Sequence, residues 1–347
     1  HPAELVASPE IVLPPRYDCT PVPPQRVAGP LRLTACGPDL YSSDGHPEPI
    51  LLNGVNMYLE WRMPPLYDAK AIGDVESVRA HLPGANLIRF VGVLWKDSIK
   101  ESDGLECSTS DVNSGYLRTD CLRAMDTMME QATEAGLWVI LAARAKYAAG
   151  YTWPEQPDVW HDTELRTKML KMWTFLAARY RHLDRVAGYE IMSEPRTKVV
   201  SQEYVMEFLQ EGCDAIAKGD PRGLCVVGPA PYYKVWNFNE AVLLHRRNIL
   251  YTFDFFIPWA LVTTDSSKSD TSYPSRMRCA SVYDTWWTNF CSSPEEMVMI
   301  DDTWLTAIID DIPGRMRREY GVPVYCNQCV AEARRYVPVL ISPANQA

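Results

Sequence analysis

The chain has 347 residues, of which 47% are hydrophobic, enough for one large domain or for two ordinary ones. A formal net charge of -10 without a basic cluster argues against a nucleic acid or an anionic membrane as partner. No apolar run is long enough for membrane insertion.

Ten cysteines are spread along the chain, and several neighbours lie about a dozen residues apart. This even number and spacing predict disulfide bonds in a secreted, extracellular protein. His1 in place of a methionine is consistent with a processed chain. Cys326 and Cys329 have the spacing of a redox or metal motif, but no second such pair and no nearby histidine accompanies them. We therefore expect neither a metal nor a cofactor.

The N-terminal part of the chain is predicted to be an arm and a hairpin. Residues 1–30 are rich in proline, which predicts an extended arm ahead of a single domain over residues 31–347. Residues 31–33 resemble a strand, and residues 41–45 end in an Asp-Gly turn. We expect an N-terminal hairpin here, followed by the first apolar run at residues 49–56.

Short apolar runs then alternate with segments of helical periodicity. The runs occupy residues 86–91, 137–141, 188–192, 223–228, 249–253 and 322–326. Apolar side chains recur at helical spacing within residues 122–132, 165–176 and 305–316. Continuous apolar strands that alternate with helices predict a parallel sheet covered by helices.

Together with the run at residues 49–56, seven strands are predicted, and they favour an α/β fold of the (β/α)8 TIM barrel type over an open doubly wound sheet. No GxGxxG or phosphate-binding loop supports a dinucleotide site. The eighth strand is missing, because a predicted helix at residues 331–340 is all that follows Gln328. Either the barrel stays open, the chain continues beyond this sequence, or another segment closes the barrel.

Glu194 is the clearest polar residue at the end of a predicted strand. It follows the apolar run 188–192 and precedes Pro195, which fixes the backbone. Enzymes with this fold carry their catalytic residues at the rim formed by the carboxyl ends of the strands. We therefore expect Glu194 to face solvent at this rim. Alternatively, it is a structural carboxylate bonded to Arg89 or Arg144.

Five segments near the predicted strand ends resemble glycoside hydrolase family 5, the family of cellulases and mannanases. They are residues 53–56, 86–89, 188–195, 251–258 and 322–328. The resemblance implies a secreted hydrolase that acts on a β-linked polysaccharide, either a β-glucan or a β-mannan. It also implies that Glu194 is the general acid/base and that Gln328 stands at the position of the nucleophile.

Four positions depart from the pattern of the family. Ser193 replaces an asparagine, and Arg144 and Asp254 replace histidines. Gln328 replaces the nucleophilic glutamate, and a neutral amide lacks the anionic oxygen that forms a glycosyl ester. Three interpretations follow: Gln328 is an engineered change, Asp254 takes over as nucleophile or base, or turnover has been lost. In the last case the protein is a carbohydrate-binding or extracellular structural protein.

The remaining site residues are assigned by their chemistry. Asp254 has a second interpretation, a buried ion pair with Arg144 that would lower its pKa and keep it ionised. Sugar sites combine aromatic rings with polar groups that bind hydroxyls. The predicted substrate-binding residues are Arg89, Arg144, Ser193, Tyr232, Trp236 and Trp259. The expected partner is a polysaccharide or oligosaccharide, with an extracellular assembly partner in the case of a structural protein.

Overall fold

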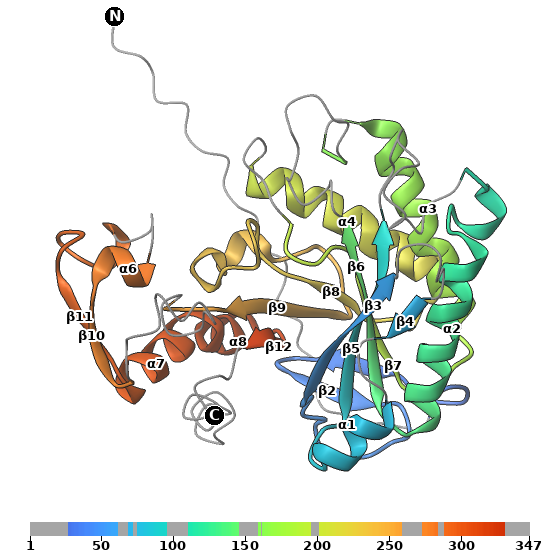
Figure 1. The fold of residues 1–347 in the computed structure, drawn as a ribbon, viewed down its shortest axis with the longest axis horizontal. Helices are drawn as coiled ribbons and strands as arrows, with labels where there is room; N and C mark the ends of the chain where they lie inside the picture. The colour runs from blue at the N-terminus through green and yellow to red at the C-terminus, as the bar shows by residue number, and fades with distance from the viewer. Residues whose placement is uncertain are drawn as a thin grey trace, which may run out of the picture.

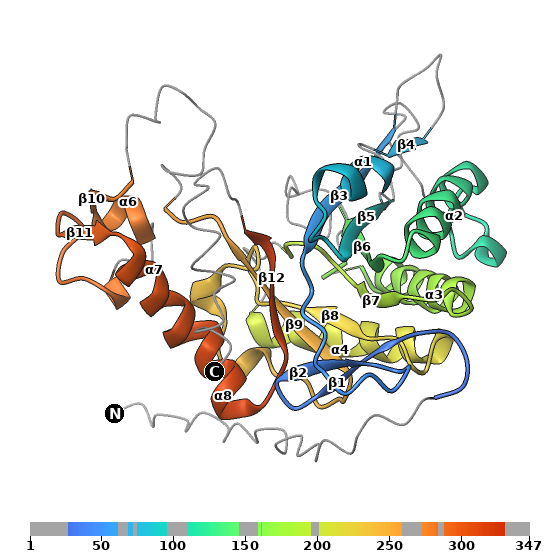
Figure 2. The ribbon, with the colours of Figure 1, turned by 90° about the horizontal axis from the view of Figure 1, so that it is seen from below.

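The computed structural model describes residues 27–61, 69–71, 75–95, 110–145, 159–160, 162–195, 201–258, 273–283 and 288–329. Its centre is a parallel sheet that curls into a nearly closed barrel (Figures 1 and 2). The strands follow one another in chain order: β3 (Gly54–Trp61), β5 (Leu87–Trp95), β6 (Trp138–Ala145), β7 (Val186–Glu190), β8 (Cys225–Val227), β9 (Ile249–Phe255) and β12 (Val324–Cys329). This arrangement confirms the predicted (β/α)8 type of fold.

The barrel has a seam between its first and last strands. Within the described part of the chain, β3 and β12 are not paired with each other. Among the described side chains, one bond crosses the seam, from Asn56 Nδ2 to the backbone oxygen of Asn327 at 3.3 Å. β4 (Ala69–Ala71) pairs antiparallel with the end of β3. The predicted helix at residues 331–340 lies outside the described residues.

Helices cover the outer face of the barrel (Figure 1). They are α1 (Val75–His81), α2 (Thr119–Glu134), α3 (Thr163–Tyr180), α4 (Gln202–Gly219), α7 (Asp302–Ile309) and α8 (Arg315–Tyr320), with short turns η2 (Val112–Ser114), η3 (Val235–Asn237) and η4 (Glu240–Val242). The predicted helix over residues 305–316 is divided by a π-helical turn, η6 (Asp310–Gly314), because Pro313 has no backbone N–H to donate. None of the described helices has the length and apolar character to cross a bilayer.

An insert between β9 and α7 was not predicted. It consists of β10 (Ser275–Arg278), α6 (Cys279–Tyr283) and β11 (Met297–Ile300), and we call it the β10–β11 insert. It lies beside the barrel in both views (Figures 1 and 2). Its buried side chains join a cluster that also contains Phe253 and Phe255 of β9.

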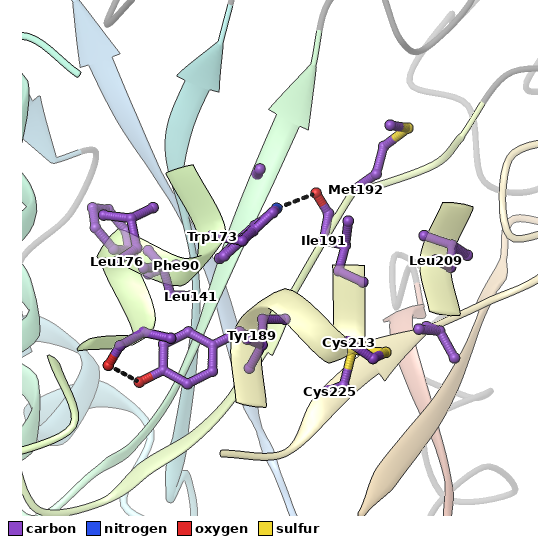
Figure 3. Packing of buried hydrophobic residues seen from close by; sticks show 14 of the residues in the cluster. Phe90, Leu141, Trp173, Leu176, Tyr189, Ile191, Met192, Leu209, Cys213 and Cys225 are labelled. Atoms are coloured by element: carbon purple, nitrogen blue, oxygen red, sulfur yellow. Dashed lines mark hydrogen bonds between the residues drawn. A yellow bond between two sulfur atoms is a disulfide. The ribbon is translucent and has the colours of Figure 1, made fainter. Parts of the chain in front are cut away.

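A tightly packed apolar layer holds β7, the strand that leads to Glu194. Trp173 of α3 packs edge-on against Tyr189 with ring centroids 6.3 Å apart, and its indole N–H donates to the Ile191 oxygen at 3.1 Å (Figure 3). The Cys213–Cys225 disulfide fastens α4 to β8 in the same layer (Figure 3). The end of β7 is therefore fixed by packing and not only by its sheet partners.

The N-terminal hairpin closes the bottom of the barrel. β1 (Leu33–Cys36) and β2 (Asp39–Ser42) pair antiparallel, and Leu33 and Leu40 pack against barrel residues such as Leu224. The hairpin was predicted, but its turn lies at residues 37–38 and not at the Asp-Gly pair. Gly37 makes this possible because its φ of 57° is left-handed. Residues 1–26 of the predicted arm lie outside the described residues.

Disulfide pairing agrees with the cysteine spacing. Two bonds join cysteines twelve residues apart, Cys213–Cys225 and Cys279–Cys291. A third joins Cys326 to Cys329 within β12. The two cysteines of the CxxC motif are therefore bonded to each other.

Candidate active site

Glu194, Asp254 and Gln328 meet at the carboxyl end of the barrel, although Glu194 follows β7, Asp254 lies in β9 and Gln328 lies in β12. Gln328 Nε2 donates to Glu194 Oε1 at 2.7 Å and to Asp254 Oδ2 at 3.2 Å. These two carboxylate oxygens therefore lie no more than about 5.9 Å apart, the sum of the two distances. Separate segments thus bring the three predicted residues into one hydrogen-bonded group.

The backbone at Glu194 is held in a conformation that few residues adopt. Its φ of 51° is left-handed, which costs a non-glycine residue about 1–3 kcal/mol. Hydrogen bonds on both sides stabilise it, from Ser193 N to Ala143 O at 2.7 Å and from Tyr232 N to Pro195 O at 2.9 Å. The Glu194 side chain is partly exposed, so it is the accessible carboxylate of the group.

Asp254 is the buried member of the group, with 4% of its surface exposed. Its Oδ1 is buried and has no hydrogen-bond partner among the described residues. Burial and the charge of Glu194 raise the pKa of Asp254 well above its usual range, and Arg89 opposes this only in part. The raised pKa favours the protonated carboxyl group, the reverse of what an ion pair with Arg144 would cause. The side chain of Arg144 lies outside the described residues.

Arg89 does hold a carboxylate, but that carboxylate is Glu190. Its Nε and Nη2 donate to Glu190 Oε2 and Oε1 at 2.6 and 2.7 Å, and Nη2 also donates to Ser193 Oγ at 2.7 Å. Both partners of this bidentate pair are fully buried. Sequence reasoning missed Glu190. The signal was a charged residue inside an apolar strand, which must find a partner when it is buried.

Asn327 completes a polar layer beneath the three site residues. Its Nδ2 donates to Glu190 Oε1 at 3.4 Å, and its Oδ1 accepts from the Tyr325 hydroxyl at 2.9 Å. Asn56 Oδ1 accepts from Arg89 Nη1 at 3.4 Å. We call Asn56, Arg89, Glu190 and Asn327 the polar layer. It joins β3, β5, β7 and β12 directly below Glu194 and Gln328.

The predicted aromatic residues have different environments. Tyr232 is partly exposed, and Lys234 Nζ lies 5.6 Å from the centre of its ring. Trp236 packs on Tyr283 and Phe290, with ring centroids 4.9 Å from each. Its ring is therefore a contact between the barrel and the β10–β11 insert, and its sugar binding stays a prediction. Trp259 lies outside the described residues.

Tyr233, the neighbour of Tyr232, is not among the predicted substrate-binding residues, yet it supports the site. Tyr233 is fully buried and its hydroxyl donates to the backbone oxygen of Met192, two residues before Glu194. The backbone oxygen of Tyr233 accepts a hydrogen bond from the backbone N–H of Asp254 at 2.7 Å. This one residue thus connects the backbones that carry both carboxylates. Among the described residues, no group of three or more His, Cys, Asp or Glu could hold a metal ion.

Comparison with known proteins bears on the fold and the family. At a TM-score of 0.57, the chain resembles the cellulose synthase subunit Z (CcsZ) of Clostridioides difficile, with 15% identity over 86% of this chain and 89% of that one. The crystal structure of a glycoside hydrolase gives a TM-score of 0.57, with 14% identity over 84% of this chain and 83% of that one. Thermotoga maritima Cel5A in complex with mannotriose gives a TM-score of 0.51, with 16% identity over 74% of this chain and 70% of that one.

No curated protein sequence matches the chain significantly. At these low identities the structural likeness shows the fold alone, so the family rests on a sequence match. The model of the cellulase family, glycosyl hydrolase family 5, matches residues 51–321 and ends just before β12, the strand of Gln328. Since this match spans well over half of the sequence and includes Glu194, the chain belongs to glycosyl hydrolase family 5.

Proposed function

We propose that the protein is a secreted glycoside hydrolase that cleaves a β-linked polysaccharide, a β-glucan or a β-mannan. The observation that carries this proposal is the amide of Gln328, bonded to both Glu194 and Asp254. The two carboxyl groups of retaining glycosidases lie about 5–5.5 Å apart, and those of inverting enzymes about 6.5–9.5 Å. An upper limit of about 5.9 Å between the bonded oxygens fits the retaining arrangement better.

In this proposal Glu194 is the general acid/base and Asp254 supplies the second carboxyl group. Hydrolysis needs one protonated and one ionised carboxyl group at the scissile bond. The raised pKa of Asp254 supports a pair that carries one proton between its members. That proton lies on Asp254 before substrate binds and has to pass to Glu194 for catalysis, which leaves Asp254 ionised while Glu194 protonates the leaving oxygen. Gln328 forms no bond to the sugar and instead holds the two carboxyl groups at a fixed separation.

The location and the substrate follow from the same observations. Three disulfides within the described residues support an oxidising, extracellular environment. The partly exposed Tyr232 beside Glu194 supports sugar binding, because an aromatic face packs on the apolar face of a pyranose. The polysaccharide chain would lie across the rim, with its scissile bond over Glu194.

A second candidate function is carbohydrate binding without turnover. Two observations favour it: an amide at the usual position of the nucleophile, and a replacement carboxyl group that is only 4% exposed. Such a protein would keep the rim of the barrel as a binding surface for polysaccharide. Extracellular structural roles belong to the same candidate.

Release of reducing ends from a panel of β-glucans and β-mannans tests the first candidate. Glu194→Gln and Asp254→Asn should each lower the rate at least about 100-fold, the usual contribution of a general acid or base. Glu207→Gln, on the exposed face of α4, should retain the full rate. If turnover persists in both site variants, the carboxyl pair is not the catalytic apparatus.

Calorimetry with the same oligosaccharides tests the second candidate. Saturable binding without release of reducing ends would support it, and Gln328→Glu should then create measurable turnover, because it restores an ionisable nucleophile. If wild type shows neither binding nor turnover on any glucan or mannan, the assignment of a saccharide site is wrong.

A further inference from the structure

The Cys326–Cys329 disulfide lies where a regular strand could not form one. Side chains alternate between the two faces of a strand, so residues three apart point in opposite directions and their Cα atoms lie about 10 Å apart. In β12 the two Cα atoms are 6.0 Å apart, within the range that a disulfide can span. Something in β12 must bring both cysteines to one face.

A β-bulge at Asn327 does this. Cys326 pairs with Phe253 of β9 and Gln328 pairs with Asp254, so Asn327 is an extra residue without a partner in the ladder. Both cysteines then face outward and pack on the cluster that contains Phe253 and Phe255. Two consecutive residues, Asn327 and Gln328, turn inward to the polar layer and to the carboxyl pair.

We propose that the Cys326–Cys329 disulfide is the positioning element of the candidate active site, because it fixes the bulge that points Gln328 at Glu194 and Asp254. The disulfide and a regular strand exclude each other, so β12 cannot lose the bulge while the bond is intact. Without the bond, the strand can lose its extra residue. A shift of one residue then turns an inward side chain to the outer face.

The other contacts of β12 are too few or too weak to hold the bulge at Asn327 without the disulfide. One edge of β12 pairs with β9. The other edge faces the seam, where the described residues provide one bond, from Asn56 Nδ2 to the backbone oxygen of Asn327. The Asn327 side chain bonds to Glu190 Oε1 at a long 3.4 Å and to the Tyr325 hydroxyl at 2.9 Å. Tyr325 belongs to β12 itself, so the second bond does not anchor the strand to the rest of the barrel. Gln328 is held by the same two carboxyl groups that it positions, so these bonds give it no independent anchor.

The test compares two variants that each lose one disulfide. Cys326→Ser/Cys329→Ser removes the proposed positioning bond. Cys279→Ser/Cys291→Ser removes the bond of the β10–β11 insert, which spans twelve residues instead of three and so stabilises the fold more by loop closure. The readout is the rate at which the Nε2 protons of Gln328 exchange with water, in protein labelled with nitrogen-15 at glutamine side chains. Gln328→Glu identifies the signal, since it deletes that resonance.

We expect exchange of the Gln328 protons to become at least tenfold faster in Cys326→Ser/Cys329→Ser and to stay as in wild type in Cys279→Ser/Cys291→Ser. Tm should fall further in Cys279→Ser/Cys291→Ser than in Cys326→Ser/Cys329→Ser. If a general loss of stability caused the faster exchange of the Gln328 protons, exchange would therefore be faster in Cys279→Ser/Cys291→Ser. Unchanged exchange in the first variant overturns the proposal. If the serine pair does not fold, Cys326→Ala/Cys329→Ala gives the same comparison without a buried hydroxyl.

A role of the disulfide in catalysis rests on the proposed function. The exchange measurement tests the position of Gln328 and does not require any activity. If the protein hydrolyses glucan or mannan, Cys326→Ser/Cys329→Ser should lower kcat with a smaller change in KM, because the carboxyl pair and not the sugar surface is disturbed. A protein without any sugar activity still supports the inference if exchange accelerates in this variant alone. The failure of the two proposals is therefore distinguishable.

Discussion

The two largest effects on the Asp254 carboxyl group act in the same direction, and both raise its pKa. Burial to 4% exposure removes the water that would solvate a charge, and nearby Glu194 adds a like charge. Arg89 opposes both, but its guanidinium group is already bonded to Glu190. The folded protein therefore keeps a proton on Asp254 at pH values where the unfolded chain has released it.

Asp254→Asn should change the pH dependence of stability. The folded protein binds this proton more tightly than the unfolded chain, so the free energy of unfolding of wild type falls as pH rises from about 4 to the raised pKa, by up to about 1.4 kcal/mol per pH unit. Asparagine cannot ionise, so the variant lacks this loss. Urea unfolding between pH 4 and 8 should show an advantage of the variant that grows with pH. The exposed Asp311→Asn should follow wild type, and parallel curves for Asp254→Asn would contradict the assignment.

The sequence predicts the positions of polar residues at strand ends better than those of polar residues within strands. Glu194, Asp254 and Gln328 were predictable together because the carboxyl ends of parallel strands share one rim. Glu190 was not, because a pattern of apolar residues hides a charge whose partner lies on another strand. Asn327 was not either, since its inward direction depends on the bulge, and regular alternation would assign Asn327 and Gln328 to opposite faces.

The N-terminal hairpin is fastened to the barrel through one buried guanidinium group. Arg32 is 1% exposed and its Nε donates to Asp220 Oδ2 at 3.1 Å. Its other nitrogens donate to backbone oxygens at the C-terminal end of α3, among them Arg181 O at 2.7 Å. Arg32 therefore satisfies carbonyl groups that the end of a helix leaves unpaired, and it joins the hairpin to α3 and to the residue that follows α4.

Arg32→Met should destabilise the protein by about 3–5 kcal/mol, because it leaves Asp220 buried without its cation. The loss is measurable as a lower free energy of unfolding in urea. A matched control is Arg278→Met, which breaks an ion pair with Glu295 whose side chains are 65% and 67% exposed. That change should cost less than about 1 kcal/mol. Equal losses in the two variants would show that the hairpin does not depend on this contact.

For the whole molecule, the order of the strands was predictable and the closure of the barrel was not. Alternating apolar runs and helical segments specify a parallel sheet in chain order. The hairpin turn at Gly37 and the β10–β11 insert depend on short local contacts that leave little periodicity in the sequence. Closure depends on the seam, where the bond from Asn56 to Asn327 replaces a strand ladder over the described residues.

A seam of this kind should make the barrel open from its two end strands. Amide hydrogen exchange measured by mass spectrometry should be faster in β12 and in residues 54–58 of β3, which β4 does not pair with, than in β6 and β7, because the latter have a paired strand on both sides. Asn56→Ala removes the bond across the seam and should accelerate exchange in β3 and β12 while β6 and β7 keep their rates. Thr174→Ala is the matched control, since it removes a side-chain bond of 3.0 Å to Ala215 O that joins α3 to α4 away from the seam, together with a bond of 3.2 Å to Leu170 O within α3. Uniform acceleration in Asn56→Ala would mean that the barrel opens as one cooperative unit, and the seam would then have no separate role in its stability.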